Sequence, residues 1–309
     1  MRSIGAVTIL VGLGCTLLLG GIAISSPALT GNPRLSAVHV AFGEMVPRGW
    51  DRMGKVDGLL SEDWYVKKTA HTISYGREVD LRYVDEVVEG LEASYSANQS
   101  FLGVTPPILP LEFYFCSMDQ PASVQPKFLS RLGGMNRFAG VALGGTKICC
   151  VNLGDARHSN VYTPWQMAET ARHEMNHLFA FQMQRSDRNR SWGWLFEALA
   201  HTIENTVKPT GSQMNLALMK QFMRGYKTVD ASWTSLISDR NSQELEQYRD
   251  YNNLLISIIY YIQETYGRDS IARLMRNCRG KDLEDAFLAT FGKGVKDLEA
   301  GWKKFYEIR

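Results

Sequence analysis

The sequence predicts an α+β fold, in which a small lobe built on a mixed sheet comes first and a mainly helical lobe follows. Two observations support this prediction. Short runs rich in β-branched and aromatic residues, separated by glycine turns, lie in the first half of the chain. After Thr163 the apolar residues recur at helical spacing. The composition, 45% hydrophobic and 21% charged, is that of an ordinary globular protein.

The first lobe is predicted to alternate strands with short helices. A helix that begins with "DLRYVDEVVEG" ends at Gly103, since glycine commonly closes a helix. A strand pair is predicted around the Gly144-Gly145 turn. In chain order the predicted elements are a strand at 71–76, a helix at 80–103, a strand at 109–116, a short helix at 125–133 and the strand pair at 140–154.

A long helix is predicted from residue 164. Thr163 stands at the N-cap position, Pro164 at the first helical position, and Gln166 where a capping box places Glu or Gln. Within this helix lies "ARHEMNHLFA", with His173 and His177 four residues apart. Side chains at this spacing lie one above the other on a helix, so both imidazoles can reach one metal ion.

Glu174 follows the first of these histidines and is rotated one step from the ligand face. A carboxylate in that place can take a proton from a zinc-bound water. Two histidines leave a tetrahedral zinc ion one further protein ligand and one open position.

The predicted third ligand is Glu197, on a second amphipathic helix that opens with "SWGWLFEALA". The small residues Ala198 and Ala200 would let this helix lie close to the first one. His201, one turn later, is the rival ligand. The metzincin class of metallopeptidases is excluded, since a metzincin would have Gly at position 180 and His at position 183, where this chain has Ala180 and Met183.

These residues resemble the gluzincin metallopeptidases, in particular the peptidase MA-like domain. The resemblance rests on His173-Glu174-x-x-His177, on "WLFEALA", and on the tail "YNNLLISIIYYIQETYG", which is followed by Phe-Gly, Leu-Glu and Trp. It covers residues 65–309. Ala198, where relatives commonly have Gly, and His201 depart from the family pattern, but neither removes a ligand.

The resemblance implies a thermolysin-like fold with zinc between the two lobes. It also implies that a sheet edge beside the metal binds extended peptide, a role that would fall to "TKICCVNL" unless this segment is an ordinary core strand. The stretch lacks the Gly-x-Met-Glu-Asn motif with which zinc aminopeptidases hold an amino terminus. An endopeptidase is therefore expected, with an aminopeptidase as the alternative.

The resemblance further assigns an oxyanion donor to Tyr251, which precedes the apolar helix, and Tyr248 is the neighbouring alternative. Tyr260 and Tyr261 lie within the apolar run and are expected in the core.

Other classes of function remain open. The domain could be an inactive binding module, or the zinc could be structural, and a fourth ligand would favour the latter.

The first residues predict export. Ile4 to Ile24 carry no charge and follow Arg2, which is typical of a signal peptide or a membrane anchor. The predicted organisation is therefore an export segment at 1–25, a linker or loosely packed lead-in at 26–63, and the metallopeptidase domain at 64–309. The catalytic part would be secreted, periplasmic or anchored outside the cytoplasm.

The net charge bears on the binding partners, and the cysteine count bears on disulfide bonds. A net charge of +2 gives no electrostatic basis for nucleic-acid binding, so a peptide or protein substrate is expected. Beyond the apolar segment, Cys116, Cys149, Cys150 and Cys278 form an even set, which in an oxidising compartment favours disulfides. Cys116 could pair with Cys149 or Cys150.

Overall fold

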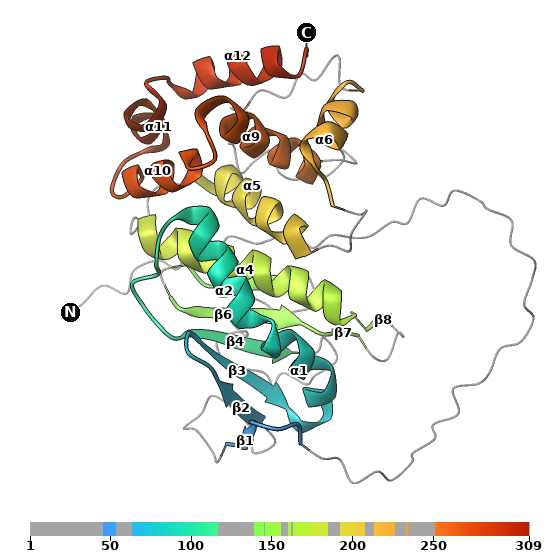
Figure 1. Cartoon of the computed structure of the whole chain (residues 1–309). Helices are drawn as coiled ribbons and strands as arrows, with labels where there is room; N and C mark the ends of the chain where they lie inside the picture. The colour runs from blue at the N-terminus through green and yellow to red at the C-terminus, as the bar shows by residue number, and fades with distance from the viewer. Residues whose placement is uncertain are drawn as a thin grey trace, which may run out of the picture.

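The computed structural model describes residues 46–53, 64–116, 139–144, 146–155, 160–161, 163–184, 192–207, 213–225, 233 and 251–308. Within these residues a mixed sheet is built mainly from the first half of the chain, and a helical lobe is built from the second half (Figure 1). The predicted α+β architecture is confirmed. The predicted helix at 125–133 lies outside the described residues.

The sheet has six strands in the order β1-β2-β3-β4-β6-β5. Strands β3, β4 and β6 are parallel neighbours, whereas β1, β2 and β5 each run antiparallel to their neighbours. A separate two-stranded ribbon precedes the long helix. The strands are β1 (Asp51–Arg52), β2 (Trp64–Lys68), β3 (Thr72–Arg77), β4 (Leu111–Cys116), β5 (Gly140–Ala142), β6 (Ile148–Asn152), and in the ribbon β7 (Gly154–Asp155) and β8 (Asn160–Val161).

The predicted strand pair is present as β5 and β6, but the expectation that "TKICCVNL" forms the sheet edge is wrong. Strand β6 pairs with β4 on one side, where Tyr114 faces Cys150, and with β5 on the other, where Val141 faces Cys150. The second strand of the hairpin is therefore the inner one, and its residues are buried from Cys149 to Asn152. The outer position at this end of the sheet belongs to β5.

Helices α1 (Leu81–Glu89) and α2 (Leu91–Leu102) replace the single helix predicted at 80–103. Gly90 ends α1 and begins the turn into α2, which lets each helix bury its own apolar face. Gly103 ends α2 as predicted, with a φ of 62° that favours glycine.

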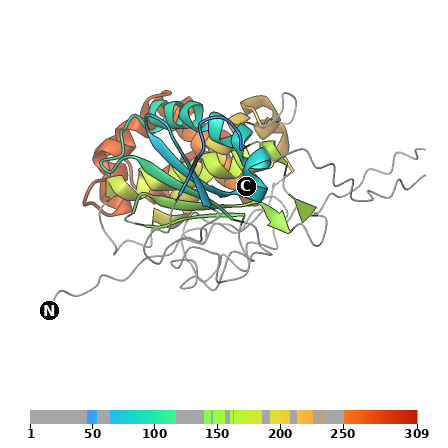
Figure 2. The ribbon, with the colours of Figure 1, turned by 90° about the horizontal axis from the view of Figure 1, so that it is seen from below.

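The long helix α4 (Pro164–Gln184) lies against the sheet, and α5 (Gly193–Glu204) lies between α4 and the helical lobe (Figure 1). Seen from below, α1, α2 and α4 cover one face of the sheet (Figure 2). The helical lobe consists of α6 (Leu216–Met223), α9 (Tyr251–Tyr266), α10 (Ser270–Asn277), α11 (Leu283–Phe291) and α12 (Val295–Phe305).

Buried amides fix α4 against α2. The Asn176 side chain donates a hydrogen bond to Asn98 Oδ1 at 2.8 Å, and Asn98 donates to the Ser94 carbonyl at 3.0 Å. Arg172 Nε donates to Ser94 Oγ at 3.2 Å. Since Asn176 stands directly before His177, these bonds hold the histidine-bearing turn in one register.

The lead-in predicted at 26–63 contributes strand β1 and Trp50. The Trp50 indole is buried and donates a hydrogen bond to Asp85 Oδ1 at 2.7 Å. The predicted export segment, Ile4 to Ile24, lies outside the described residues, and in the part of the chain that is described no helix is long and apolar enough to cross a membrane.

All four cysteines beyond the apolar segment are buried free thiols, so the expected pairing of Cys116 is absent from the structure. Cys116 and Cys150 share the same sheet face, in the cluster of Trp64, Tyr114, Val141 and Leu143. Cys149 points to the opposite face, toward the main core. In the strand register Cys116 lies opposite Asn152, and its thiol contacts that of Cys150 without a disulfide.

Candidate metal centre

The centre forms where α4 crosses α5. The capping box predicted for α4 is present, since the Thr163 N–H donates to Gln166 Oε1 at 2.9 Å and the Gln166 N–H donates to Thr163 Oγ1 at 3.4 Å. This fixes where the helix begins and hence which of its faces meets α5. His173 and His177 lie on that face, and both are buried.

Three side chains converge there from the two helices. His173 Nε2 lies 3.0 Å from His177 Nε2 and 3.4 Å from Glu197 Oε2. His177 Nε2 lies 3.3 Å from Glu197 Oε1. In a tetrahedral zinc site with bonds of about 2.0–2.1 Å, neighbouring ligand atoms lie roughly 3.3–3.4 Å apart. The three residues predicted as ligands are thus together, at separations that fit one ion.

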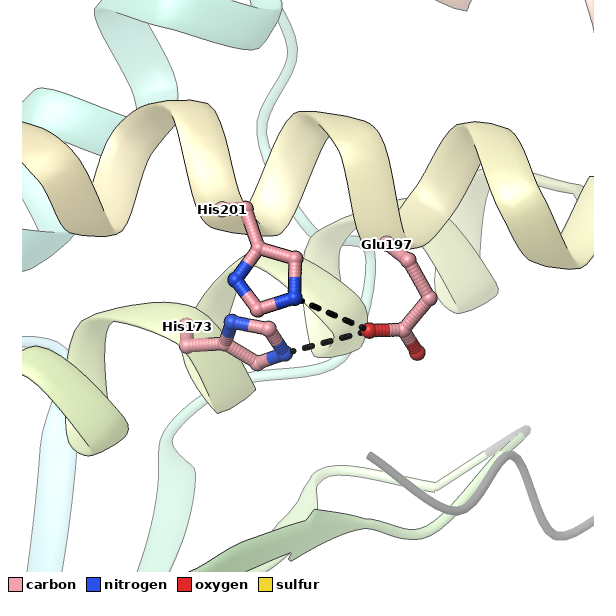
Figure 3. Close-up of side chains that lie close together, drawn as sticks. All are labelled: His173, Glu197 and His201. Atoms are coloured by element: carbon pink, nitrogen blue, oxygen red, sulfur yellow. Dashed lines mark ion pairs between the residues drawn. The ribbon is translucent and has the colours of Figure 1, made fainter. Parts of the chain in front are cut away.

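A second arrangement contains His201. His173, Glu197 and His201 each offer a ligand atom, and these atoms all lie within 4.8 Å of one another. Figure 3 shows that the Nε2 atoms of both histidines face the same carboxylate oxygen of Glu197. The His201 distance to that oxygen, Glu197 Oε2, is 3.9 Å, longer than the corresponding His173 distance of 3.4 Å.

Glu204, a residue for which sequence reasoning assigned no role, supports both histidines from behind. Its Oε2 atom lies 2.9 Å from His173 Nδ1 and 2.9 Å from His201 Nδ1. Buried metal-binding histidines commonly donate their second ring N–H to a carboxylate, which fixes the ring and the tautomer. Glu204 is seven residues after Glu197, and this helical spacing on the same face was the only available signal.

The charges of this cluster are strongly coupled. Burial opposes the charged form of His173, but hydrogen bonds with Glu197 and Glu204 raise its pKa well above the usual range. Burial likewise opposes ionisation of both carboxyls, yet the neighbouring histidines hold the pKa of Glu197 well below its usual value. They also lower the pKa of Glu204. Both carboxylates are therefore ionised and can only accept hydrogen bonds.

Glu174 lies between the metal-facing histidines and the edge strand β5. Its side chain is 2% exposed, and its carboxylate accepts a hydrogen bond from the Ala142 N–H. A Cβ atom added at Gly140 would lie 2.6 Å from Glu174 Cγ, so glycine at this position makes the approach possible. Burial raises the pKa of Glu174, against the opposing effect of His173 and His177.

The donor set fits a metal ion. An ionised Glu204 requires the hydrogen of His173 to be on Nδ1, so a neutral His173 presents a lone pair from Nε2. Glu197 Oε1 and Glu174 Oε2 are buried, and no hydrogen-bond donor from the described residues reaches them within bonding geometry. Acceptors that converge without a donor are stabilised by a cation, and two imidazoles with one carboxylate are a usual ligand set for zinc.

The predicted tyrosine donor stays a prediction. Tyr251 is the first residue of α9, and Tyr248 lies outside the described residues. Tyr261 is 3% exposed and belongs to the core, as expected. Tyr260 is partly buried against the same core, and its hydroxyl donates to the Met214 carbonyl.

Comparison with known families gives one match. Residues 131–307, more than half of the chain, match the Peptidase MA superfamily. This range contains β5, β6, the crossing of α4 with α5, and nearly all of the helical lobe. A search of curated proteins finds no match.

Proposed function

The chain belongs to the Peptidase MA superfamily of metallopeptidases, and we propose that it is a zinc-dependent endopeptidase whose metal is held by His173, His177 and Glu197. The observation that supports this most directly is the convergence of the acceptor atoms of three side chains, at separations of 3.0, 3.3 and 3.4 Å. Glu174, buried beside them, supplies a carboxylate that no ion pair in the described part of the chain engages.

Zinc is the metal that this set of ligands favours, since borderline nitrogen ligands with one carboxylate are typical of catalytic zinc sites. When bound there, it would supply Lewis acidity that polarises a peptide carbonyl and lowers the pKa of water to about 7. The protein's own contribution is the geometry. Helix α4 provides two ligands and the base, α5 provides the third ligand, and Glu204 orients His173.

Glu174 is the proposed general base. Its carboxylate accepts the proton of the attacking water and later delivers it to the leaving amine. Burial raises its pKa above the ordinary carboxylate value, which makes its carboxylate a stronger base. The Ala142 N–H holds one oxygen in place and leaves Oε2 without a partner for the incoming water.

An extended polypeptide is the proposed substrate, bound along β5. The Leu143 N–H donates inward to the Ile148 carbonyl, so the backbone groups of Gly140 and Ala142 face outward at the edge. The Ala142 N–H is engaged by Glu174, but among the described residues no strand pairs with the outer side of β5, and such an edge can add one more strand through main-chain hydrogen bonds. Such binding needs no free terminus, and the chain has no Gly-x-Met-Glu-Asn motif, which supports internal cleavage.

Two further assignments complete the proposal. Tyr251, which begins α9, is the proposed donor to the oxyanion that forms on the carbonyl oxygen. The catalytic domain is proposed to act outside the cytoplasm, secreted, periplasmic or attached to the membrane through residues 4–24, because Arg2 precedes an uncharged apolar run.

A mixed peptide library tests the activity. The full chain is incubated with the library, with and without a chelator, and cleavage positions are read by mass spectrometry. Chelator-sensitive internal cuts are expected. Trimming only from amino ends would identify an aminopeptidase instead. No turnover with metal bound would identify a binding module.

A further inference from the structure

His201 is a buried histidine that the proposed ligand set does not use. It lies on α5 one turn after Glu197, and its side chain is 9% exposed. Its ring centroid lies 4.6 Å from that of His173, with an interplanar angle of 64° (Figure 3). His201 therefore shares the buried volume of the metal centre.

The tautomer of His201 follows from its contact with Glu204. His201 Nδ1 lies 2.9 Å from Glu204 Oε2, and a carboxylate at this distance holds the ring hydrogen of a histidine on Nδ1. The Nε2 atom then carries a lone pair, and it faces Glu197 Oε2 at 3.9 Å. Two acceptors that face each other in a buried site repel unless a cation lies between them.

His173 meets the same conditions. Its Nδ1 donates to the same oxygen of Glu204, and its Nε2 faces the same oxygen of Glu197. The two imidazoles are thus held alike by one carboxylate and directed at another. If contact of Nδ1 with Glu204 and of Nε2 with Glu197 makes His173 a metal ligand, the same contacts orient His201 to bind the same ion.

We propose that His201 Nε2 is a fourth protein ligand of this metal site in the substrate-free enzyme. This inference depends on the proposed function, because it concerns the same ion. The 3.9 Å separation from Glu197 exceeds the roughly 3.3 Å expected between ligands of one tetrahedral ion, so the ring moves by about half an ångström to bind.

This ligand regulates access to the metal. Four protein ligands leave a tetrahedral ion without an open position, as in structural sites, whereas three leave room for water and substrate. The substrate-free enzyme is therefore closed, and His201 leaves the metal when peptide binds. The hydrogen bond to Glu204 keeps the displaced ring beside the site.

The test counts the imidazole ligands directly. The full chain is loaded with an NMR-active cadmium isotope after growth on nitrogen-labelled histidine, and one-bond couplings between cadmium and ring nitrogens are recorded without substrate. Three coupled histidines are expected. His201→Gln should reduce the number to two, and a tight-binding peptide-like inhibitor that occupies the metal should do the same in the natural sequence.

Metal affinity and turnover provide an independent readout. His201→Ala should weaken zinc binding at least about tenfold, as loss of a metal-supporting side chain commonly does. At saturating zinc its kcat/KM should exceed that of the natural sequence, because no side chain then has to leave the metal before peptide binds. His71→Ala is the matched control, because His71 bonds Glu92 and stacks on Tyr95 away from the centre, and it should leave metal affinity unchanged.

The outcomes separate the two claims. If the protein binds no stoichiometric metal, the proposed function fails. If it binds metal with only two coupled histidines and His201→Gln keeps both couplings, the metal site stands and the His201 proposal is overturned.

Discussion

His173 makes the central contact of the metal site through both of its ring nitrogens. Nδ1 is bound to Glu204, and Nε2 lies near both His177 and Glu197. Without an ion, the two carboxylates stabilise the protonated ring and raise its pKa well above the usual range. A metal ion and this proton therefore compete for the same atom.

This competition predicts that metal affinity rises with pH. A group whose folded-state pKa is raised keeps its proton to higher pH, so each bound ion must displace a proton below that pKa. Zinc affinity should increase between about pH 6 and pH 8, and calorimetry in buffers of different ionisation enthalpy should detect proton release. An affinity that is flat over this range, with no proton release, would contradict the assignment of His173.

Tyr251→Phe tests the proposed oxyanion donor. A hydroxyl that acts mainly in the transition state should lower kcat about 10²–10³-fold when it is removed, with little change in KM or in zinc content. Tyr248→Phe, measured on the same peptide, is the control and should keep the natural kcat. A natural kcat in the Tyr251 variant would end the proposal.

Sequence spacing was sufficient to predict which residues meet at the proposed metal site, but not which residue holds them in place. The i, i+4 spacing brought His173 and His177 together, and Glu197 lies beside them. Glu204 was not predicted, because an acidic residue at the end of a helix is ordinarily solvated, and only the crossing of two helices buries this one.

At the scale of elements, the edge strand β5 and helix α4 approach closely. Gly140 faces Thr170 and Glu174, and an added Cβ would lie 2.7 Å from Thr170 Cγ2 and 2.6 Å from Glu174 Cγ. Since real Cβ contacts are longer, any side chain at this position must displace the base or the strand. No local pattern predicts this contact, which joins residues 34 positions apart.

Gly140→Ala should therefore impair catalysis without removing the metal. A displaced Glu174 should lower kcat by roughly 10–100-fold, as misplacement of a reacting group commonly does. The zinc content should be unchanged, since Gly140 contacts no proposed ligand in the described structure.

Gly90→Ala is the matched control. Its φ of −81° suits alanine, and the nearest neighbouring atom, the Val87 carbonyl oxygen, would lie 3.4 Å from the new Cβ. It should keep the natural kcat. Full activity in Gly140→Ala would show that β5 does not position the base.

Several elements departed from the sequence prediction for identifiable reasons. Strand β2, "WYVKK", was not predicted, because its apolar residues are consecutive and do not alternate. Strand β6 was predicted at the sheet edge, which β5 occupies, because the sequence pattern of a hairpin does not indicate which of its two strands pairs with the rest of the sheet. The capping box of α4 was predicted correctly because it depends only on neighbouring residues.

At the scale of the whole molecule, the metal centre lies where the two lobes meet. Helix α4 packs on the sheet while α5 leads into the helical lobe, so the ligands come from both sides of the junction (Figure 1). The order of the lobes could be predicted from local periodicity. Their relative placement depends on long-range packing, such as that of Gly103 at the end of α2 against Ala272 of α10.

Export of the domain is a prediction about the whole chain. Arg2 precedes the apolar run, and no charged residue follows until Arg34, so the amino terminus should stay in the cytoplasm while the rest crosses the membrane. Reporter fusions after residue 40 should be active only if the reporter works outside the cytoplasm. Activity of a cytoplasm-only reporter at this junction would contradict the prediction.

The metal content and hydrolysis rate of Glu174→Gln, measured beside the natural sequence on one cleaved peptide, test the central claim most directly. Because the substitution leaves every proposed ligand in place but removes the base, zinc should remain near stoichiometric while hydrolysis falls by several orders of magnitude. Glu197→Ala, the control that removes a ligand, should lose zinc. Retained hydrolysis in Glu174→Gln, or loss of its zinc, would contradict the account.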